Sequence, residues 1–153
     1  MKYAFLSALA CLAVSLLSAA PANASEDVVV YTVEAPFADV ASDVNDAIVN
    51  RGYLVDYHGL IGEMLKRTAA DVGASKTLYR NAEFFQFCSA VVSRRVMEQD
   101  AANIAYCPYI LFVYETEDAP GKVNVGFRRL PEGGGRDEVN TLLDEMAREA
   151  SGN

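Results

Sequence analysis

Two strand-like segments follow each other late in the chain with only a turn between them, and this pattern limits the fold more than any other. The run Tyr109–Tyr114 is apolar throughout and long enough for a central strand. After a turn over Glu115–Gly121, the segment Lys122–Arg129 alternates polar and apolar residues with a period of two, so one of its faces is expected to be buried and the other wet. The two segments predict a β-hairpin.

The rest of the chain alternates between strand patterns and helix patterns. In order, the sequence predicts a strand at Val28–Val33, a helix that stops at Gly52, a strand at Tyr53–Tyr57, a helix that stops at Gly73, a strand at Glu83–Cys88 and a helix that Ser89 caps and that runs to about Gln99. Ile104–Cys107 is expected to be extended. The flexible joint Gly133–Gly135 then leads to a helix whose apolar stripe should dock on the sheet.

This order of elements predicts an α+β fold: a single domain with helices packed on one mainly antiparallel sheet. A doubly wound nucleotide-binding fold is disfavoured, because the first strand is followed by Glu34-Ala35-Pro36 and not by a glycine-rich turn. The α+β domain is expected over residues 25–130, and the glycine linker and C-terminal amphipathic helix over residues 131–153.

Residues 1–24 are expected to be an export signal and not part of the fold. Lys2 precedes an apolar run from Ala4 to Leu17, and Ala22-Asn23-Ala24 offers the small residues that signal peptidase requires. The apolar run is shorter than the ~20 residues that a membrane-spanning helix needs. We therefore expect cleavage after Ala24, a periplasmic location, and no membrane span in the mature chain.

The charge of the chain excludes one class of partner. The chain has 153 residues, with 13 basic and 21 acidic residues and a net charge of −8. Binding to duplex nucleic acid draws most of its affinity from clustered Lys and Arg, so nucleic acid is not expected as a partner. Arg128-Arg129 is too small a basic patch to indicate a function, and the carboxylates of Asp144 and Glu145 are expected on a solvated helix face.

Two cysteines, Cys88 and Cys107, remain once the leader is removed. In an oxidising compartment such a pair predicts a disulfide, and closing a loop of about 19 residues contributes around 3 kcal/mol in the chain-entropy model. The alternative is a reactive thiol, because Cys88 at a helix N-terminus would meet the positive end of the helix dipole. A third hypothesis joins His58, Cys88 and Cys107, with Met97, as soft ligands for copper or a haem-like group.

No catalytic residue is assigned. A set of Ser89, His58 and an acid would lack the turn that presents a nucleophilic serine in hydrolases. Aromatic side chains are dense in the second half of the chain and could line a ligand cavity, although such density at strand spacing is more typical of a core. These residues are Phe84, Phe85, Phe87, Tyr106, Tyr109, Phe112 and Tyr114.

Several short motifs together resemble a known family. They are Phe87-Cys88-Ser89, Tyr106-Cys107-Pro108-Tyr109, Val113-Tyr114-Glu115, Gly121-Lys122-Val123, and Asp56-Tyr57-His58 followed by the helix around Glu63–Thr68. Over about Val28 to Leu130 the chain is similar to the family named domain of unknown function 302. The chain departs from the family at two points: Phe87 precedes the first cysteine where many members have Gly, and Ser89-Ala90 follows it where many have Asn-Pro. The resemblance implies a compact α+β domain and no established reaction.

The sequence therefore predicts an exported binding or accessory module without assigned catalysis or cofactor. Its expected partner is an unknown small ligand or a periplasmic protein, and a homodimer formed through a strand edge or the C-terminal stripe is a further prediction. The alternative function is a thiol-redox or metal- or haem-binding protein that uses Cys88, Cys107 and His58.

Overall fold

The structure is a computed structural model that describes residues 27–153, so the predicted leader and its cleavage site at Ala24 lie outside the described residues. The elements, in order, are β1 (Val28–Glu34), α1 (Phe37–Val49), β2 (Val55–Gly59), α2 (Ile61–Thr68), β3 (Tyr79–Phe87), α3 (Ala90–Gln99), the 3-10 helix η1 (Ala101–Tyr106), β4 (Tyr109–Thr116), β5 (Lys122–Arg128) and α4 (Arg136–Ser151). Within residues 27–153, none of the helices is long and apolar enough to cross a bilayer.

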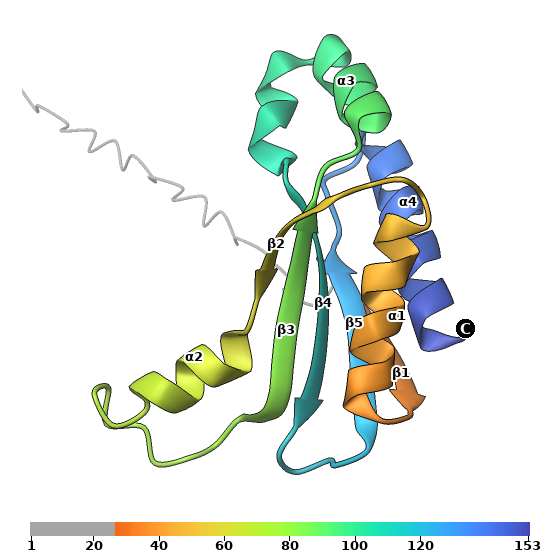
Figure 1. Cartoon of the computed structure of the whole chain (residues 1–153). Coiled ribbons are helices and arrows are strands. Elements are labelled where there is room, and N and C mark those ends of the chain that lie inside the picture. Colours follow the sequence, from red (N-terminus) through yellow and green to blue (C-terminus); the bar gives the residue numbers. More distant parts are fainter. Residues whose placement is uncertain (1–26) are drawn as a thin grey trace, which may run out of the picture.

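The five strands form one sheet in the order β1-β5-β4-β3-β2, and every neighbouring pair is antiparallel (Figure 1). The β4–β5 hairpin predicted from the sequence is present, with Val113 opposite Val125. The predicted α+β class, with helices on one antiparallel sheet, is confirmed.

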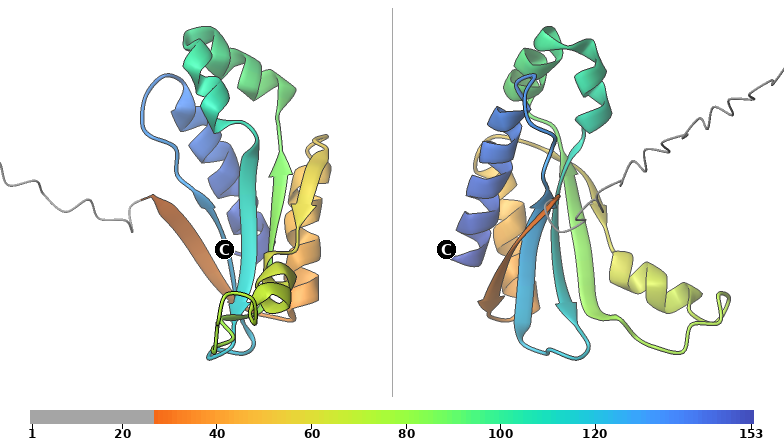
Figure 2. Two further views of the ribbon diagram at one scale, coloured as in Figure 1. Left: turned by 90° about the vertical axis from the view of Figure 1, so that its left-hand side faces the viewer. Right: turned by 180° about the vertical axis from the view of Figure 1, so that it is seen from behind.

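Helices α1 and α4 lie side by side on one face of the sheet (Figures 1 and 2). Alternate strand residues point toward them, and the core consists of the side chains between the two layers. Its largest fully buried members are Phe87, Phe127, Ile48, Leu111, Leu143 and Met146. The side chain of Asn140 on α4 makes hydrogen bonds to both backbone groups of Leu130, at 2.8 and 2.9 Å, and so holds the segment after β5 against the helix.

Two predicted boundaries are wrong in the first half of the chain. β2 runs from Val55 to Gly59, so the strand begins and ends two residues later than the predicted Tyr53–Tyr57 and contains His58, which the prediction left just after the strand. Helix α2 ends at Thr68 and continues as turns to Gly73, where the predicted helix would have ended. No residue of α2 is buried, so tertiary packing does not support further helical turns.

The segment before β4 also differs from the prediction. Ile104–Cys107 was expected to be extended, but residues up to Tyr106 form η1. The side chain of Asp100 accepts a hydrogen bond from the backbone N–H of Ala102 at 2.9 Å and so caps this short helix. η1 folds back beside α3, and the two together stand above one end of the sheet (Figure 2).

The second face of the sheet is left largely open by the helices. In the left-hand view of Figure 2 it lies toward the viewer, with α2 at its lower end and η1 at its upper end. Its central side chains, Ile110, Phe112 and Tyr114 of β4 and Phe84 of β3, are only partly buried. This face is therefore a shallow aromatic surface between two raised ends.

Candidate functional site

An open cavity of about 340 Å³ lies where η1 overhangs the open face of the sheet. Tyr106 of η1 and the following Pro108 form one wall, and Ile110 and Phe112 of β4 form the floor. Val28 and Arg128, which are paired across β1 and β5, lie at the rim. The lining is mainly apolar, and the volume falls within the range of small-molecule sites.

The wall of this cavity is fastened to the sheet by a disulfide. Cys88 directly follows β3, Cys107 directly follows η1, and the structure joins their sulfurs across a Cα–Cα distance of 6.4 Å. Ser89, the next residue, caps α3 by accepting a hydrogen bond from the N–H of Val92. The disulfide therefore fixes the point at which η1 returns to β4.

A second fastening comes from Arg136 at the start of α4. Its guanidinium donates to the side-chain oxygen of Asn103 at 2.8 Å and stacks over the ring of Tyr106, with its Cζ 5.4 Å from the ring centroid. Asn103 is buried and donates to the backbone carbonyls of Val96 and Gly134. The 3-10 helix is thus tied to α3, to the glycine joint and to α4, which preorganises the cavity wall.

A buried polar pair, the phenol of Tyr109 and the hydroxyl of Ser93, lies beside the disulfide. The phenol accepts a hydrogen bond from the hydroxyl of Ser93 at 3.1 Å, and the same hydroxyl lies 3.9 Å from the sulfur of Cys107. Burial raises the pKa of Tyr109, and the hydrogen bond from Ser93 only partly offsets this. At neutral pH the phenol is therefore un-ionised and serves as a polar anchor for β4.

Comparison with known proteins agrees with this fold. The family model described as domain of unknown function DUF302 matches residues 29–151. The chain belongs to this family. A search of curated proteins finds no match. A crystal structure of an uncharacterised conserved DUF302 protein from Bacillus stearothermophilus is similar over 80% of this chain and 97% of that one, with a TM-score of 0.64 and 12% identity. At that identity the likeness shows the shared fold.

The DUF302 match extends past Leu130, where the resemblance in the sequence motifs ended, and includes α4. It therefore contains both cysteines and Arg136, which fasten the cavity wall. Asp27 and Val28 at the rim precede the matched span.

The structure does not bring His58, Cys88 and Cys107 of this DUF302 protein together as a set of metal ligands. His58 on β2 lies opposite Phe85 on β3. Cys88 comes three residues after Phe85, and three residues of a strand span ~10 Å. Both sulfurs are used in the disulfide. Within residues 27–153, no group of three or more His, Cys, Asp or Glu side chains has the geometry to hold a metal ion.

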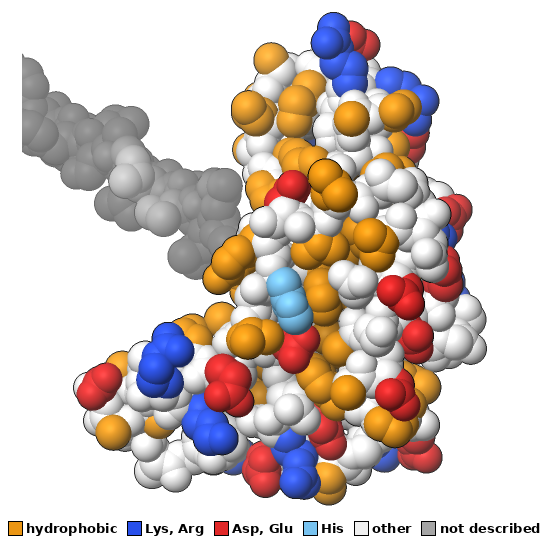
Figure 3. All heavy atoms as spheres, in the orientation of Figure 1, with side chains coloured by type: hydrophobic (Ala, Val, Ile, Leu, Met, Phe, Trp, Pro, Cys, Tyr) orange, Lys and Arg blue, Asp and Glu red, His pale blue; other side chains and the backbone are white. Residues whose placement is uncertain are grey.

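His58 has its own environment at the β2 edge of the sheet. Its Nε2 lies 2.7 Å from a carboxylate oxygen of Glu83, and its ring stacks on Phe85 with centroids 4.3 Å apart. The histidine, pale blue in Figure 3, lies at the surface near apolar and acidic side chains. The hydroxyl of Ser89 instead caps α3, so the structure does not bring Ser89 and His58 into a nucleophile–base pair.

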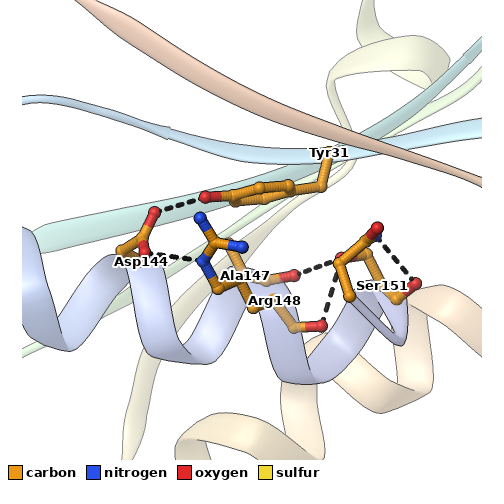
Figure 4. A network of polar contacts seen from close by, with 6 residues as sticks. Tyr31, Asp144, Ala147, Arg148 and Ser151 are labelled. Atoms are coloured by element: carbon orange, nitrogen blue, oxygen red, sulfur yellow. Dashed lines mark hydrogen bonds and ion pairs between the residues drawn. The ribbon is translucent and has the colours of Figure 1, made fainter.

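A second polar cluster joins β1 to α4 (Figure 4). The hydroxyl of Tyr31 donates to Asp144 at 2.5 Å, and Nε of Arg148 donates to the other oxygen of the same carboxylate at 2.8 Å. The guanidinium of Arg148 also lies over the Tyr31 ring. The sequence predicted that Asp144 lies on a solvated helix face. In the structure its carboxylate instead faces the edge strand β1, where Tyr31 supplies a hydrogen-bond donor.

The three groups set one another's ionisation. Burial alone would raise the pKa of Asp144, but the hydrogen bonds from Tyr31 and Arg148 and the positive charge of Arg148 outweigh it and lower that pKa. Burial, followed by the hydrogen bond to Asp144, raises the pKa of Tyr31. Each group stabilises the ionisation state that the others need, so this cluster fits a structural role.

The aromatic residues divide between the two faces of the sheet. Phe85, Phe87 and Tyr109 are buried under the helices, whereas Phe84, Phe112 and Tyr114 are only partly buried. Of the aromatic side chains that could line a ligand cavity, Tyr106, Tyr109 and Phe112 do line it. The place of the cavity could not be predicted from the sequence, because its rim and wall come from segments far apart in the chain. The position of Arg128 on the polar face of the alternating strand Lys122–Arg129 was the one local signal for the rim.

Proposed function

We propose that this DUF302 protein is an exported binding module that acts in the periplasm and holds one small, mainly apolar ligand in the cavity beneath η1. The observation that carries the proposal is a mainly apolar cavity of about 340 Å³ whose wall is held by the disulfide and by Arg136. A preformed wall favours binding, because less conformational freedom is lost when the ligand enters. Export rests on the leader predicted for residues 1–24.

A neutral fluorescent probe tests the binding function. N-phenyl-1-naphthylamine is apolar, and its emission rises when it leaves water for an apolar site. We expect saturable binding of one probe per chain. The substitution Ala105→Trp should abolish it, because residue 105 lines the cavity and an indole would fill the space.

The matched control for this experiment is Ala101→Trp. Residue 101 lies on the same 3-10 helix and is exposed, but it is not part of the lining. With three residues per turn, the side chain at position 101 points in a different direction from that at position 105. Absence of probe binding to the natural sequence, or equal binding to both tryptophan variants, would overturn the proposed function.

The second candidate is a thiol-redox function of Cys88 and Cys107. The observation that favours it is the place of Cys88 two residues before α3, next to the N-cap Ser89, where the helix dipole stabilises a thiolate. Titration of thiols with and without reductant separates the two functions. A binding module has an inert disulfide, whereas a redox protein has a pair that is readily reduced and reacts fast.

The predicted homodimer remains a prediction. In the single chain β1 is hydrogen-bonded to β5 on one side, and the sheet order leaves its other edge unpaired among the described residues. Val28 and Val30 on this strand are exposed, so the edge offers apolar side chains as well as backbone groups.

A further inference from the structure

The rim of the cavity carries positive charge although the protein as a whole is acidic. The lining contains two arginines, Arg128 and Arg129, and one carboxylate, Asp27. The net charge of the chain is −8. The cavity lining therefore has a net charge of opposite sign to that of the whole chain.

The two arginines differ in where they point. In a strand, consecutive side chains point to opposite faces, and the residues of β5 that face the helices are Val123, Val125 and Phe127. Arg128 therefore belongs to the open face, opposite Val28 on β1. Arg129 follows the strand and also borders the hollow around Tyr31 and Asp144, where its charge acts on both groups.

Arg128 and Arg129 both line the cavity and take part in no ion pair among residues 27–153, and of the two Arg128 is the one on the open face. Arg136 uses its guanidinium on Asn103 and on the backbone carbonyls of Pro131 and Glu132. By contrast, Arg128 is exposed. Its five N–H groups are available to a ligand, in a planar arrangement that matches a carboxylate or a similar acid.

We propose that the ligand is an apolar monoanion: its hydrocarbon or aromatic body lies between η1 and β4, and its single acidic group binds Arg128 at the rim. This inference rests on the proposed function and adds the chemical class of the ligand. A charge-assisted hydrogen bond at the border of an apolar cavity is stronger than one in open water. The carboxylate of Asp27 at the same rim disfavours a second negative charge on the ligand.

A pair of probes that share one ring system tests the proposal. 1-Anilinonaphthalene-8-sulfonate is N-phenyl-1-naphthylamine with one added sulfonate, so the two probes differ in a single negative charge. We expect the natural protein to bind the anionic probe more tightly than the neutral one. We also expect this advantage to shrink as the salt concentration rises, because the rim is exposed to solvent.

The decisive variant is Arg128→Gln. We expect it to weaken binding of the anionic probe about tenfold and to change binding of the neutral probe much less, by no more than about twofold. Lys122→Gln is the matched control, because Lys122 is exposed on the same strand and the same face but lies outside the lining. Thermal unfolding of both variants should match that of the natural protein, which excludes probe binding to a loosened fold.

The outcomes separate this inference from the proposed function. If the neutral probe binds and Arg128→Gln leaves the anionic probe unaffected, the inference is overturned and the binding function stands. Equal losses in Arg128→Gln and Lys122→Gln would show a general charge effect and would also overturn it. If neither probe binds, both proposals fail.

Discussion

Phe112 on β4 lies directly opposite Gly126 on β5, and its ring occupies the space that a side chain at position 126 would need. A Cβ atom at Gly126 would lie 2.7 Å from Cζ of Phe112 and would overlap the carbonyl oxygen of Val29 on β1. The same relationship recurs at the other side of the open face, where Phe84 lies opposite Gly59. Two cross-strand glycines thus make room for two of the aromatic rings of this face, one of which, Phe112, forms part of the floor of the cavity.

This relationship predicts unequal costs for two alanine substitutions. Gly126→Ala should lower the free energy of unfolding by about 3 kcal/mol, because its Cβ meets backbone and β1 would have to move away from β5. Gly59→Ala should cost less, because its Cβ meets only the end of the Phe84 ring, which can turn away. Urea unfolding of the two variants measures the difference. Equal losses of unfolding free energy in the two variants would contradict the argument that a Cβ at Gly126 collides with the backbone of β1.

Loss of the disulfide should weaken both the fold and the cavity. The bridge closes a loop with a sequence separation of 19 between Cys88 and Cys107. Replacing both cysteines with serine should lower the free energy of unfolding by about 3 kcal/mol and reduce affinity for the neutral probe, since the wall at η1 loses one fastening. Reductant should have the same effect on the natural protein and none on the double variant. Unchanged probe affinity would show that Arg136 and Asn103 hold the wall by themselves.

Removal of the Tyr31 hydroxyl should loosen the edge strand from α4. We expect Tyr31→Phe to lower the free energy of unfolding by about 1 kcal/mol, because Asp144 loses a donor in a partly buried position. The pKa of Tyr31 is raised from 10.0, so its contribution is present below that pH and is lost as pH rises through the pKa of the folded state. Unfolding measured across the alkaline range should therefore show a weaker pH dependence in Tyr31→Phe than in the natural protein.

The β4–β5 hairpin should be sensitive to acid through Glu115. This side chain is 8% exposed, and its carboxylate accepts hydrogen bonds from the N–H of Gly121 at 2.8 Å and from the amide of Asn81 at 2.9 Å. The bond from Gly121 is the main cause that lowers the pKa of Glu115, and it outweighs the effect of burial. The contribution of Glu115 is therefore present above its ordinary pKa of 4.5 and is lost as pH falls through the lowered value.

The substitution Glu115→Gln tests this directly. It should cost about 2 kcal/mol at neutral pH, because a charge-assisted acceptor is replaced by a neutral amide, and it should flatten the loss of stability in acid. Glu117→Gln, which changes an exposed carboxylate next to the same hairpin, is the control and should change neither quantity. If Glu115→Gln still loses stability steeply as pH falls, other carboxylates cause the acid sensitivity.

Local signals were enough to predict much of this fold. Ser89 was recognised as the cap of α3, and the helix does end at Gln99, because a capping hydroxyl and an apolar period are both properties of adjacent residues. The β4–β5 hairpin was predicted for the same reason. The position of His58 was not, because β2 has an irregular register between Val55 and Tyr57, which depends on its pairing with β3 and not on its own sequence.

The candidate site was beyond the reach of such signals. At its rim Val28 pairs with Arg128, which is 100 residues later in the sequence. Its wall forms only because η1 folds back over β4. The cap at Asp100 could have indicated η1, since an Asp before two alanines favours a helix start. The Phe112–Gly126 pair, by contrast, depends on strand register, which the alternation of Lys122–Arg129 leaves open.

Export and disulfide formation should occur together. We expect N-terminal sequencing of protein from the periplasm to begin at Ser25, two residues before the cavity rim at Asp27. The exported protein should have no free thiol, whereas protein made in the cytosol without residues 1–24 should have two, because the cytosol keeps cysteines reduced. The cytosolic form should also bind the neutral probe more weakly until it is oxidised. A first residue other than Ser25 or its immediate neighbours would refute the predicted cleavage site. Two free and fast-reacting thiols in the exported protein would show that Cys88 and Cys107 have a chemical role in place of a structural one.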